Sequence, residues 1–206
     1  MRTVYLVTHP EATHHVQALV GGWYDAALTA RGAEHARRIA VALRGRIPTG
    51  EAVQVFSSDL RRTRQTAGPI AAALGVDVAI DAALREQSYG DAEGRPAGTL
   101  RFVPPPAVGD RLHHHDGVKR SETRWEVATR AYAALDRLLA GHAQRFVIVT
   151  HGGVATFLIA AWIAMPIESA GYVKFRTTPG GITVLVEDDH CHDRQLAALN
   201  DFSHLD

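Results

Sequence analysis

The sequence is short of cysteine, has no excess charge of either sign and lacks a long apolar run. Cys191 is the only cysteine in 206 residues, which excludes an intramolecular disulfide and cysteine-based zinc sites and is typical of a reducing cytoplasm. Basic and acidic residues both number 22, so no net positive charge indicates nucleic acid or a membrane surface as partner.

The longest apolar stretch, residues 154–167, is too short to span a bilayer and contains Pro166. It is typical of a buried helix. The first residues also lack the apolar segment of a signal peptide. These shortages predict a cytoplasmic protein with neither a membrane nor a nucleic-acid partner.

Short runs of strand-forming residues alternate with helical patterns along the chain. Strands are expected at residues 4–7, 53–57, 76–80, 145–150 and 182–187. Helices are expected at residues 28–47, 58–75, 121–141 and 154–167, with N-caps at Thr29 and Ser121 and C-terminal glycines at Gly75 and Gly141. The alternation predicts a single α/β domain over residues 1–206, with a mostly parallel sheet between two layers of helices.

Residues 90–120 have no clear period and include three consecutive prolines at 104–106. So long an irregular segment indicates a lid or a substrate-specificity insert. Its "RLHHHDGVKR" stretch offers these candidate ligand-binding side chains: His113, His114, His115, Lys119 and Arg120. The three histidines with Asp116 could instead bind a metal, or the stretch could be a solvated polar loop.

Two expected strands end in a threonine followed by a histidine. "VYLVTH" ends on His9 and "FVIVTHGG" on His151. Gly152 and Gly153 then expose backbone N–H groups at the start of the next helix, which suits an anion. A parallel sheet gathers the carboxyl ends of its strands into one crevice, so the two histidines are expected to lie together.

A third strand, "VFSS", leads into "DLRRTRQTA" and places Arg61, Arg62 and Arg64 near the first turn of a helix. Cations there oppose the helix dipole, so at least one of them is expected to face an anion. The alternative is that the histidines are satisfied turn residues and the arginines are solvated surface charges.

These motifs resemble those of the histidine phosphatase superfamily, the phosphoglycerate-mutase-like family. "LVTHPEA" is similar to the family's "LVRHGET", "SSDLRRTRQTA" to "SSxLxRAxQTA", "LREQSYGDAEG" to "LRExxxGxxEG", and "VTHGG" to "VSHGG". "LTARG" and the C-terminal "LNDFSHL" also resemble family segments, so the likeness runs from residue 4 to residue 205. It implies a three-layer α/β/α sandwich. It also implies a reaction that proceeds through a phosphohistidine and needs no metal or cofactor.

The resemblance also implies roles for four residues. His9 aligns with the histidine that attacks phosphorus, Arg62 with an arginine that grips the phosphoryl oxygens, His151 with the second pocket histidine, and Glu86 with the proton donor. Chemistry agrees with these roles. An attacking imidazole needs an acceptor, commonly a backbone carbonyl, at its other nitrogen, and a forked guanidinium matches phosphate oxygens.

The sequence departs from the family pattern beside the first histidine. Thr8 replaces an arginine, Pro10 replaces a glycine and removes an N–H, and His15 replaces an asparagine. The segment 121–123, "SET", only loosely resembles the family's "GES". The Thr8 hydroxyl and a protonated His14 or His15 could bind the phosphate instead. Further cations that could do so are Arg61, Arg64 and Arg85.

We therefore predict a metal-independent phosphomonoesterase that hydrolyses a small phosphorylated metabolite through a phosphohistidine at His9. The alternatives are a phosphomutase and a non-catalytic protein that binds a phosphate or another anion. A hydrolase is preferred because the family's glycolytic mutases are usually longer. A zinc site built from His9, His14 and His15 is disfavoured because the phosphatase role already accounts for His9.

Overall fold

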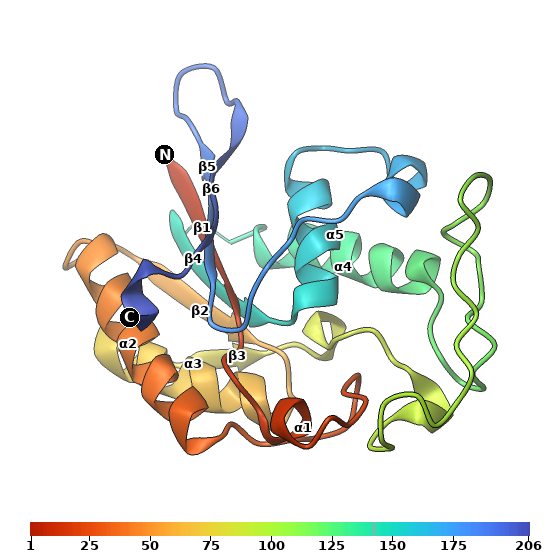
Figure 1. The fold of residues 1–206 in the computed structure, drawn as a ribbon. Coiled ribbons are helices and arrows are strands. Elements are labelled where there is room, and N and C mark those ends of the chain that lie inside the picture. Colours follow the sequence, from red (N-terminus) through yellow and green to blue (C-terminus); the bar gives the residue numbers. More distant parts are fainter. Residues whose placement is uncertain (142) are drawn as a thin grey trace.

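The computed structural model describes residues 1–141 and 143–206, which include a six-stranded sheet (Figure 1). The strand order is β3-β2-β4-β1-β5-β6. The strands are β1 (Arg2–Thr8), β2 (Val53–Ser57), β3 (Val78–Ile80), β4 (Arg145–Thr150), β5 (Ile182–Glu187) and β6 (Arg194–Asp201). The first four strands are mutually parallel, and β5 runs antiparallel to both β1 and β6. The predicted α/β fold with a mostly parallel sheet is confirmed.

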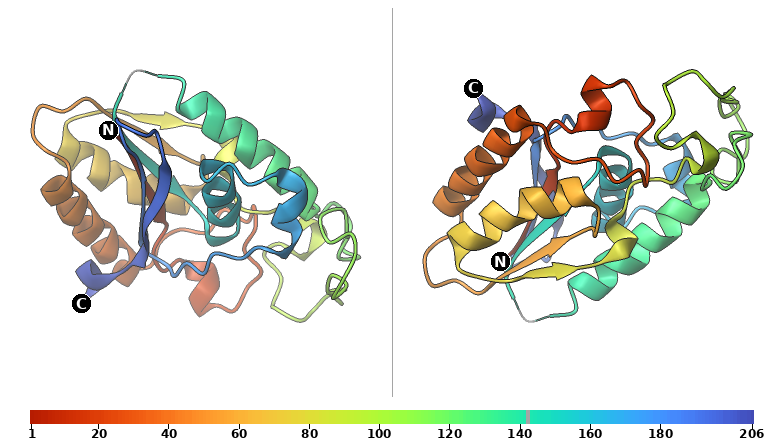
Figure 2. Two further views of the ribbon diagram at one scale, coloured as in Figure 1. Left: turned by 90° about the horizontal axis from the view of Figure 1, so that it is seen from above. Right: turned by 90° about the horizontal axis from the view of Figure 1, so that it is seen from below.

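Helices cover both faces of the sheet (Figure 2). The α-helices are α1 (Thr13–Val16), α2 (Ala30–Arg46), α3 (Arg61–Leu74), α4 (Arg124–Leu138) and α5 (Gly152–Trp162). Helices α2 and α3 pack on one face, and α4 and α5 on the other. Four short 3₁₀ helices complete the elements: η1 (Ala82–Leu84), η2 (Gly90–Ala92), η3 (Ile167–Tyr172) and η4 (Ser203–Leu205).

The central strand β1 contributes to both hydrophobic cores because successive side chains of a strand point to opposite faces. Tyr5 and Val7 pack in the core under α2 and α3, whereas Val4 and Leu6 pack in the core under α4 and α5. All four side chains are buried. This two-sided burial is why the middle of the strand is a continuous apolar run and why its polar residues lie only at its two ends.

Two predicted helix boundaries, the start of α2 and the end of α3, are correct, and the predicted start of α4 is wrong. Thr29 caps α2 by accepting a hydrogen bond from the Gly32 N–H, and Gly75 ends α3 with a left-handed φ of 71°. Helix α4 starts after Thr123, which forms a reciprocal capping box with Glu126, and not at Ser121. The Ser121 hydroxyl donates instead to the buried Asp116 carboxylate.

Other boundaries also differ from the expectation. Helix α4 ends at Leu138, short of Gly141, and α5 ends at Trp162, because the chain turns with a positive φ of 55° at Ala164 ahead of Pro166. Strand β6 was not predicted. It lies at the edge of the sheet, and its mixed, largely exposed side chains give no clean alternation.

The segment from residue 90 to 120 contains only η2 and otherwise follows an irregular path that projects from one end of the molecule (Figure 1). Its two arms meet where the Val103 N–H donates to the Asp116 carbonyl. Its base pairs with the loop after α1 through a bridge between Leu19 and Pro96. Among the residues that the structure describes, no helix has the length and apolar character to cross a membrane.

Candidate active site

The two histidines that follow β1 and β4 lie side by side at the carboxyl edge of the sheet. Thr8 and Thr150 are register partners in the parallel pair, and the His9 N–H donates to the Thr150 carbonyl at 3.1 Å. The imidazole centroids of His9 and His151 are 5.1 Å apart. Both side chains are buried. The strand register therefore brings together the histidines that the sequence placed at two strand ends.

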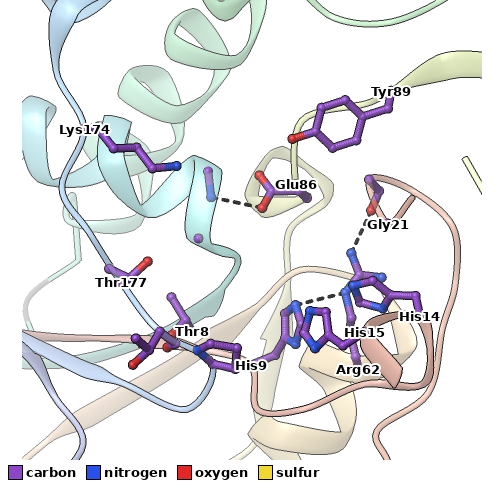
Figure 3. A pocket seen from close by; sticks show the side chains of 15 residues that line it. Thr8, His9, His14, His15, Gly21, Arg62, Glu86, Tyr89, Lys174 and Thr177 are labelled. Atoms are coloured by element: carbon purple, nitrogen blue, oxygen red, sulfur yellow. Dashed lines mark hydrogen bonds between the residues drawn. The ribbon is translucent and has the colours of Figure 1, made fainter. Parts of the chain in front are cut away.

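The hydrogen bonds of His9 define its tautomer. Nδ1 lies 2.8 Å from the Pro10 carbonyl oxygen, which can only accept, so Nδ1 carries the proton. Nε2 keeps its lone pair and accepts from Arg62 Nε at 3.1 Å (Figure 3). Burial, with the charge of Arg62, holds the pKa of His9 well below its usual value, although the Pro10 carbonyl opposes this. His9 is therefore a neutral imidazole with its proton on Nδ1 and its lone pair on Nε2.

Arg62 is fixed in the first turn of α3 by the loop that follows α1. Its Nη1 donates to the Tyr24 carbonyl at 2.8 Å and its Nη2 to the Gly22 carbonyl at 2.7 Å. The side chain is only 1% exposed. Burial lowers the pKa of its guanidinium to about 10, while Glu86 and Asp25 oppose the shift, so the group stays charged at neutral pH.

The other arginines proposed for this site lie outside the pocket. Arg61 and Arg64 are exposed on α3. Arg85 pairs with Asp59 through its Nε, at 2.7 Å, and lies over the ring of Trp23. Of the arginines considered for this site, Arg62 lines the pocket and the other three do not.

His151 is held from the neighbouring strand β2. Its Nε2 lies 2.9 Å from the Ser58 hydroxyl, which is 2.6 Å from the Thr63 hydroxyl. Its Nδ1 is buried and has no hydrogen-bond partner among the described residues. Burial first, and then the neighbouring His9 and Arg62, keeps the pKa of His151 well below its usual value. This second histidine is also neutral in the ligand-free protein.

Glu86 is positioned by two backbone N–H groups. Its Oε2 accepts from Gly153 at 2.9 Å and its Oε1 from Gln87 at 2.9 Å. A Cβ at position 153 would collide with the carboxylate, so only glycine allows this approach. Gly152, the first residue of α5, also lines the pocket. The start of α5 thus contacts the proposed proton donor, one residue after the position expected to bind an anion.

Thr8 lines the pocket, but its hydroxyl already has an acceptor. Oγ1 donates to the Thr178 carbonyl at 2.6 Å, and the Thr8 N–H donates to the Gly181 carbonyl at 3.1 Å. Thr8 therefore ties the end of β1 to the segment that precedes β5. The same segment supplies Lys174 and Thr177 to the pocket wall.

His14 and His15 add two more imidazoles to the pocket. The ring of His15 stacks on that of His9 with 5.6 Å between centroids, and the His14 ring lies 4.0 Å from that of His15. Burial, followed by His15 and Arg62, lowers the pKa of His14 to about 3. Burial and Arg62 also lower the pKa of His15, against the influence of Glu11. Neither ring is charged at neutral pH in the ligand-free protein.

These residues surround a cavity of about 320 Å³. Among the lining residues, Lys174, Tyr89 and Thr177 were not identified from the sequence. Figure 3 shows the Lys174 side chain extending toward the part of the pocket that holds Glu86. Lys174 belongs to the irregular stretch between η3 and β5, and no motif marks it. Its position follows from the packing of that stretch over the sheet edge.

The candidate lid residues do not reach this cavity. His113 pairs with Asp110 and stacks on Trp125, while His114 Nε2 lies 2.9 Å from the Val103 carbonyl oxygen. The others have local contacts or lie on a separate hollow: His115, Lys119 and Arg120. Within the described residues no group of three or more His, Cys, Asp or Glu side chains is arranged to hold a metal. The geometry thus does not support the metal-binding alternative for residues 113–116.

Comparison with known proteins identifies relatives over nearly the whole chain. The model of the histidine phosphatase superfamily (branch 1) matches residues 4–201. A protein of Proteus mirabilis named probable phosphoglycerate mutase GpmB is 32% identical over 182 residues, which cover 85% of this chain and 81% of that protein. The residues that the family model matches include both histidine motifs.

Two solved structures show the same architecture. The alpha-ribazole phosphatase from Shigella flexneri has a TM-score of 0.78 and 27% identity, with 97% of this chain and 96% of that chain covered. Bacillus stearothermophilus YhfR has a TM-score of 0.80 and 25% identity, with all of both chains covered. The fold is that of the histidine phosphatases in these comparisons.

The neutral state of His14 predicts how stability depends on pH. Its pKa is about 3 in the folded protein and near 6.5 in the unfolded chain, so between these values the unfolded chain binds a proton that the folded protein excludes. Stability therefore falls as pH falls below 6.5. The loss from this one side chain should reach about 1–2 kcal/mol at pH 5.

Urea denaturation of the parent and of His14→Gln at pH 7.5, 6 and 5 measures this effect. We expect the free energy of unfolding of His14→Gln to fall less steeply with acid than that of the parent. His190→Gln, which removes an exposed histidine from the β5–β6 hairpin, is the matched control. Equal slopes for the parent and His14→Gln would show that the fold does not exclude a proton from His14.

Proposed function

Because the chain belongs to the histidine phosphatase superfamily, we propose that it is a phosphomonoesterase acting on a small phosphorylated metabolite through a phosphohistidine at His9. The observation that carries this proposal is the tautomer of His9, whose Nδ1 proton is held by the Pro10 carbonyl. This tautomer leaves a lone pair, not a proton, on Nε2, and an attack on phosphorus requires that lone pair. Its position inside a pocket with a buried arginine adds the charge that the transferring phosphoryl group needs.

The first step transfers the phosphoryl group to His9. Nε2 attacks phosphorus while the bond between phosphorus and the ester oxygen breaks, and Glu86 gives its proton to the leaving alcohol. In the ligand-free protein Arg62 Nε–H occupies the Nε2 lone pair. The incoming phosphoryl oxygens take over this N–H, which frees the nucleophile and stabilises the charge of the transferred group.

The second step returns the enzyme to its resting state. Glu86, now ionised, removes a proton from a water molecule that attacks the phosphohistidine. The bond between phosphorus and Nε2 breaks, inorganic phosphate leaves, and His9 regains the neutral tautomer that the Pro10 carbonyl holds. Glu86 faces the pocket on the side away from the histidines, which suits both roles (Figure 3).

Thr8 stands where the family pattern has an arginine, so the pocket has one permanent cation fewer. We assign part of that arginine's role to Lys174. Among the described residues that line the pocket, Arg62 is the one arginine and Lys174 is the one lysine. Thr8 contributes indirectly, because its hydroxyl holds the Thr178 carbonyl and so the segment that carries Lys174. A lysine on this segment can bind a phosphoryl oxygen as a point charge.

His14 and His15 provide charge of a different kind. A bound dianion favours their protonated forms, against the burial that keeps them neutral in the empty pocket. We therefore assign them proton uptake coupled to anion binding. Arg62 and Lys174 would bind the anion at any ordinary pH, and the histidines would strengthen binding in mild acid.

A phosphomutase is the second candidate, because curated relatives are named as probable phosphoglycerate mutases. The same phosphohistidine would then pass its phosphoryl group to a hydroxyl of the substrate instead of to water. Assay with 3-phosphoglycerate separates the two activities, since hydrolysis releases inorganic phosphate and mutase activity yields 2-phosphoglycerate.

The first functional prediction concerns His9→Ala. Removing the nucleophile should abolish turnover of p-nitrophenyl phosphate, with a loss of at least about a thousandfold, while the fold is kept. Rapid quench of the parent with a ³²P-labelled phosphomonoester should trap an acid-labile label on the protein. His190→Ala on the exposed hairpin should keep both activity and label. Parent-like turnover by His9→Ala would contradict the phosphohistidine mechanism, and no turnover or label in the parent would favour a binding protein.

The second prediction tests Lys174. Lys174→Met should lower kcat/KM about 10- to 100-fold, the effect of losing one hydrogen bond to a charged group, and Lys174→Arg should restore most of it. Arg176→Met removes a cation from the same segment at a position outside the pocket. If Lys174→Met and Arg176→Met lower kcat/KM equally, Lys174 acts only through the general field of the surface.

The third prediction concerns the pH dependence of anion binding. Sulfate keeps a constant charge near neutrality, so its affinity should rise as pH falls below about 6.5 if His15 takes up a proton on binding. Calorimetric titrations at several pH values should show a smaller rise for His15→Asn than for the parent. The remaining pocket histidines can titrate in both proteins, so the difference reports His15. Identical affinities and pH profiles would exclude His15 from anion binding.

A further inference from the structure

A second cavity of about 200 Å³ lies beneath the irregular segment that follows η2. Its wall is mainly apolar and includes Val20, Ala92, Ala97, Leu100, Phe102 and Val118. An apolar cavity of about 150 Å³ can hold a benzene molecule, so this one is large enough for a six-carbon ring or chain. The proposed phosphohistidine reaction does not use this cavity.

The two cavities share a wall. Tyr89 lines both of them. The loop after α1 continues from one to the other, because Val20 lines the apolar cavity while Gly21 and Gly22 line the phosphate pocket. The Val20 N–H donates to the Arg95 carbonyl at 2.9 Å, which fixes this loop against the irregular segment. The two cavities are therefore adjacent, with Tyr89 and the loop of Val20 to Gly22 between them.

The direction of the reaction points the same way. In phosphoryl transfer the attacking and leaving atoms lie roughly in line through phosphorus, so the leaving oxygen faces away from His9. Glu86, the proposed donor to that oxygen, lies between the histidines and Tyr89 in Figure 3. The group attached to the leaving oxygen would thus extend past Glu86 toward Tyr89.

Tyr89 forms the boundary between the polar and the apolar cavity. Gly22, with a φ of 58°, allows the ring to approach, because a Cβ at this position would lie 3.0 Å from Tyr89 Cδ2. Burial and the nearby Glu86 raise the pKa of the Tyr89 hydroxyl, so the group stays neutral. The Tyr89 side chain is therefore an uncharged part of the wall of both cavities.

We propose that the second cavity binds the alcohol part of the substrate, and that this alcohol carries an uncharged apolar group of about six carbon atoms. The proposal rests on the proposed function for the position of the phosphate and for the direction of the leaving oxygen. Two charged residues, Arg95 and Asp116, lie in the cavity wall. The Asp116 carboxylate accepts through Oδ1 from the Ser121 hydroxyl and the Val118 N–H, while its Oδ2 is buried without a partner among the described residues.

The exposed apolar surface of the segment supports this occupant. Phe102 lines the cavity and is still 55% exposed. Covering such a ring with an apolar ligand removes its surface from water and stabilises the complex.

The test uses n-alkyl phosphates, whose leaving groups are all primary alcohols. We expect kcat/KM to rise from ethyl to butyl to hexyl phosphate, by up to about fourfold for each methylene that enters the cavity. In parallel, calorimetry with ethyl- and hexylphosphonate measures the same gain in Kd without any catalysis.

Leu100→Asp places a carboxylate in the cavity wall and should remove most of the gain with chain length, while ethyl phosphate and ethylphosphonate behave as with the parent. Val108→Asp makes the same change at an exposed residue of the same segment that does not line the cavity, and it should keep the gain. Ala97→Trp fills the cavity from an exposed position and replaces Leu100→Asp if that variant does not fold.

The results separate this proposal from the proposed function. Hexylphosphonate binding that is tighter than ethylphosphonate binding, and sensitive to Leu100→Asp, supports the apolar site even if no phosphate ester is hydrolysed. Hydrolysis of ethyl and hexyl phosphate with equal kcat/KM, together with equal Kd values for the two phosphonates, would overturn the apolar site and leave the phosphatase intact. Failure of both phosphonates to bind would also overturn it.

Discussion

The rest of the site depends on one buried positive charge. The Arg62 guanidinium donates to His9 Nε2 and to the carbonyls of Gly22 and Tyr24, and all three acceptors are neutral. A buried cation without a bonded carboxylate costs free energy that an arriving anion can offset. The same charge lowers the pKa values of the surrounding histidines, after burial itself. Burial and Arg62 together thus keep His9 neutral, and the buried charge makes the pocket favourable for an anion.

The two departures beside His9 affect this arrangement differently. Pro10 lacks an N–H, but the contact that fixes His9 uses its carbonyl, so the substitution leaves the tautomer intact. Thr8 removes a guanidinium, and its own hydroxyl is spent on the Thr178 carbonyl. The change therefore moves the need for charge from the strand end to side chains on other segments, and this is where Lys174, His14 and His15 are found.

The sequence predicts well those parts of the molecule that follow a period or a strand end. The buried strands β1 and β4 are continuous apolar runs, and their polarity changes at the histidines, so both the sheet and the position of His9 beside His151 could be anticipated. Edge strand β6 gives no such signal. Lys174 and Tyr89 lie outside the helices and strands, and only the packed fold shows that they face the pocket. The His113–His115 run stands out in the sequence but does not line the pocket. Its side chains have partners within or beside their own segment.

The two cavities are built by different parts of the fold. The residues that would handle the phosphoryl group lie at the ends of β1 and β4 and at the starts of α3 and α5, where buried neighbours fix their positions. The apolar cavity is formed largely by an irregular segment that projects from one end of the molecule. Substitutions in that segment can change the shape of the cavity without disturbing Arg62 or His9, because loops tolerate change better than the elements they connect. Under the proposed function, selectivity for the alcohol could therefore vary while the chemistry at phosphorus stays the same.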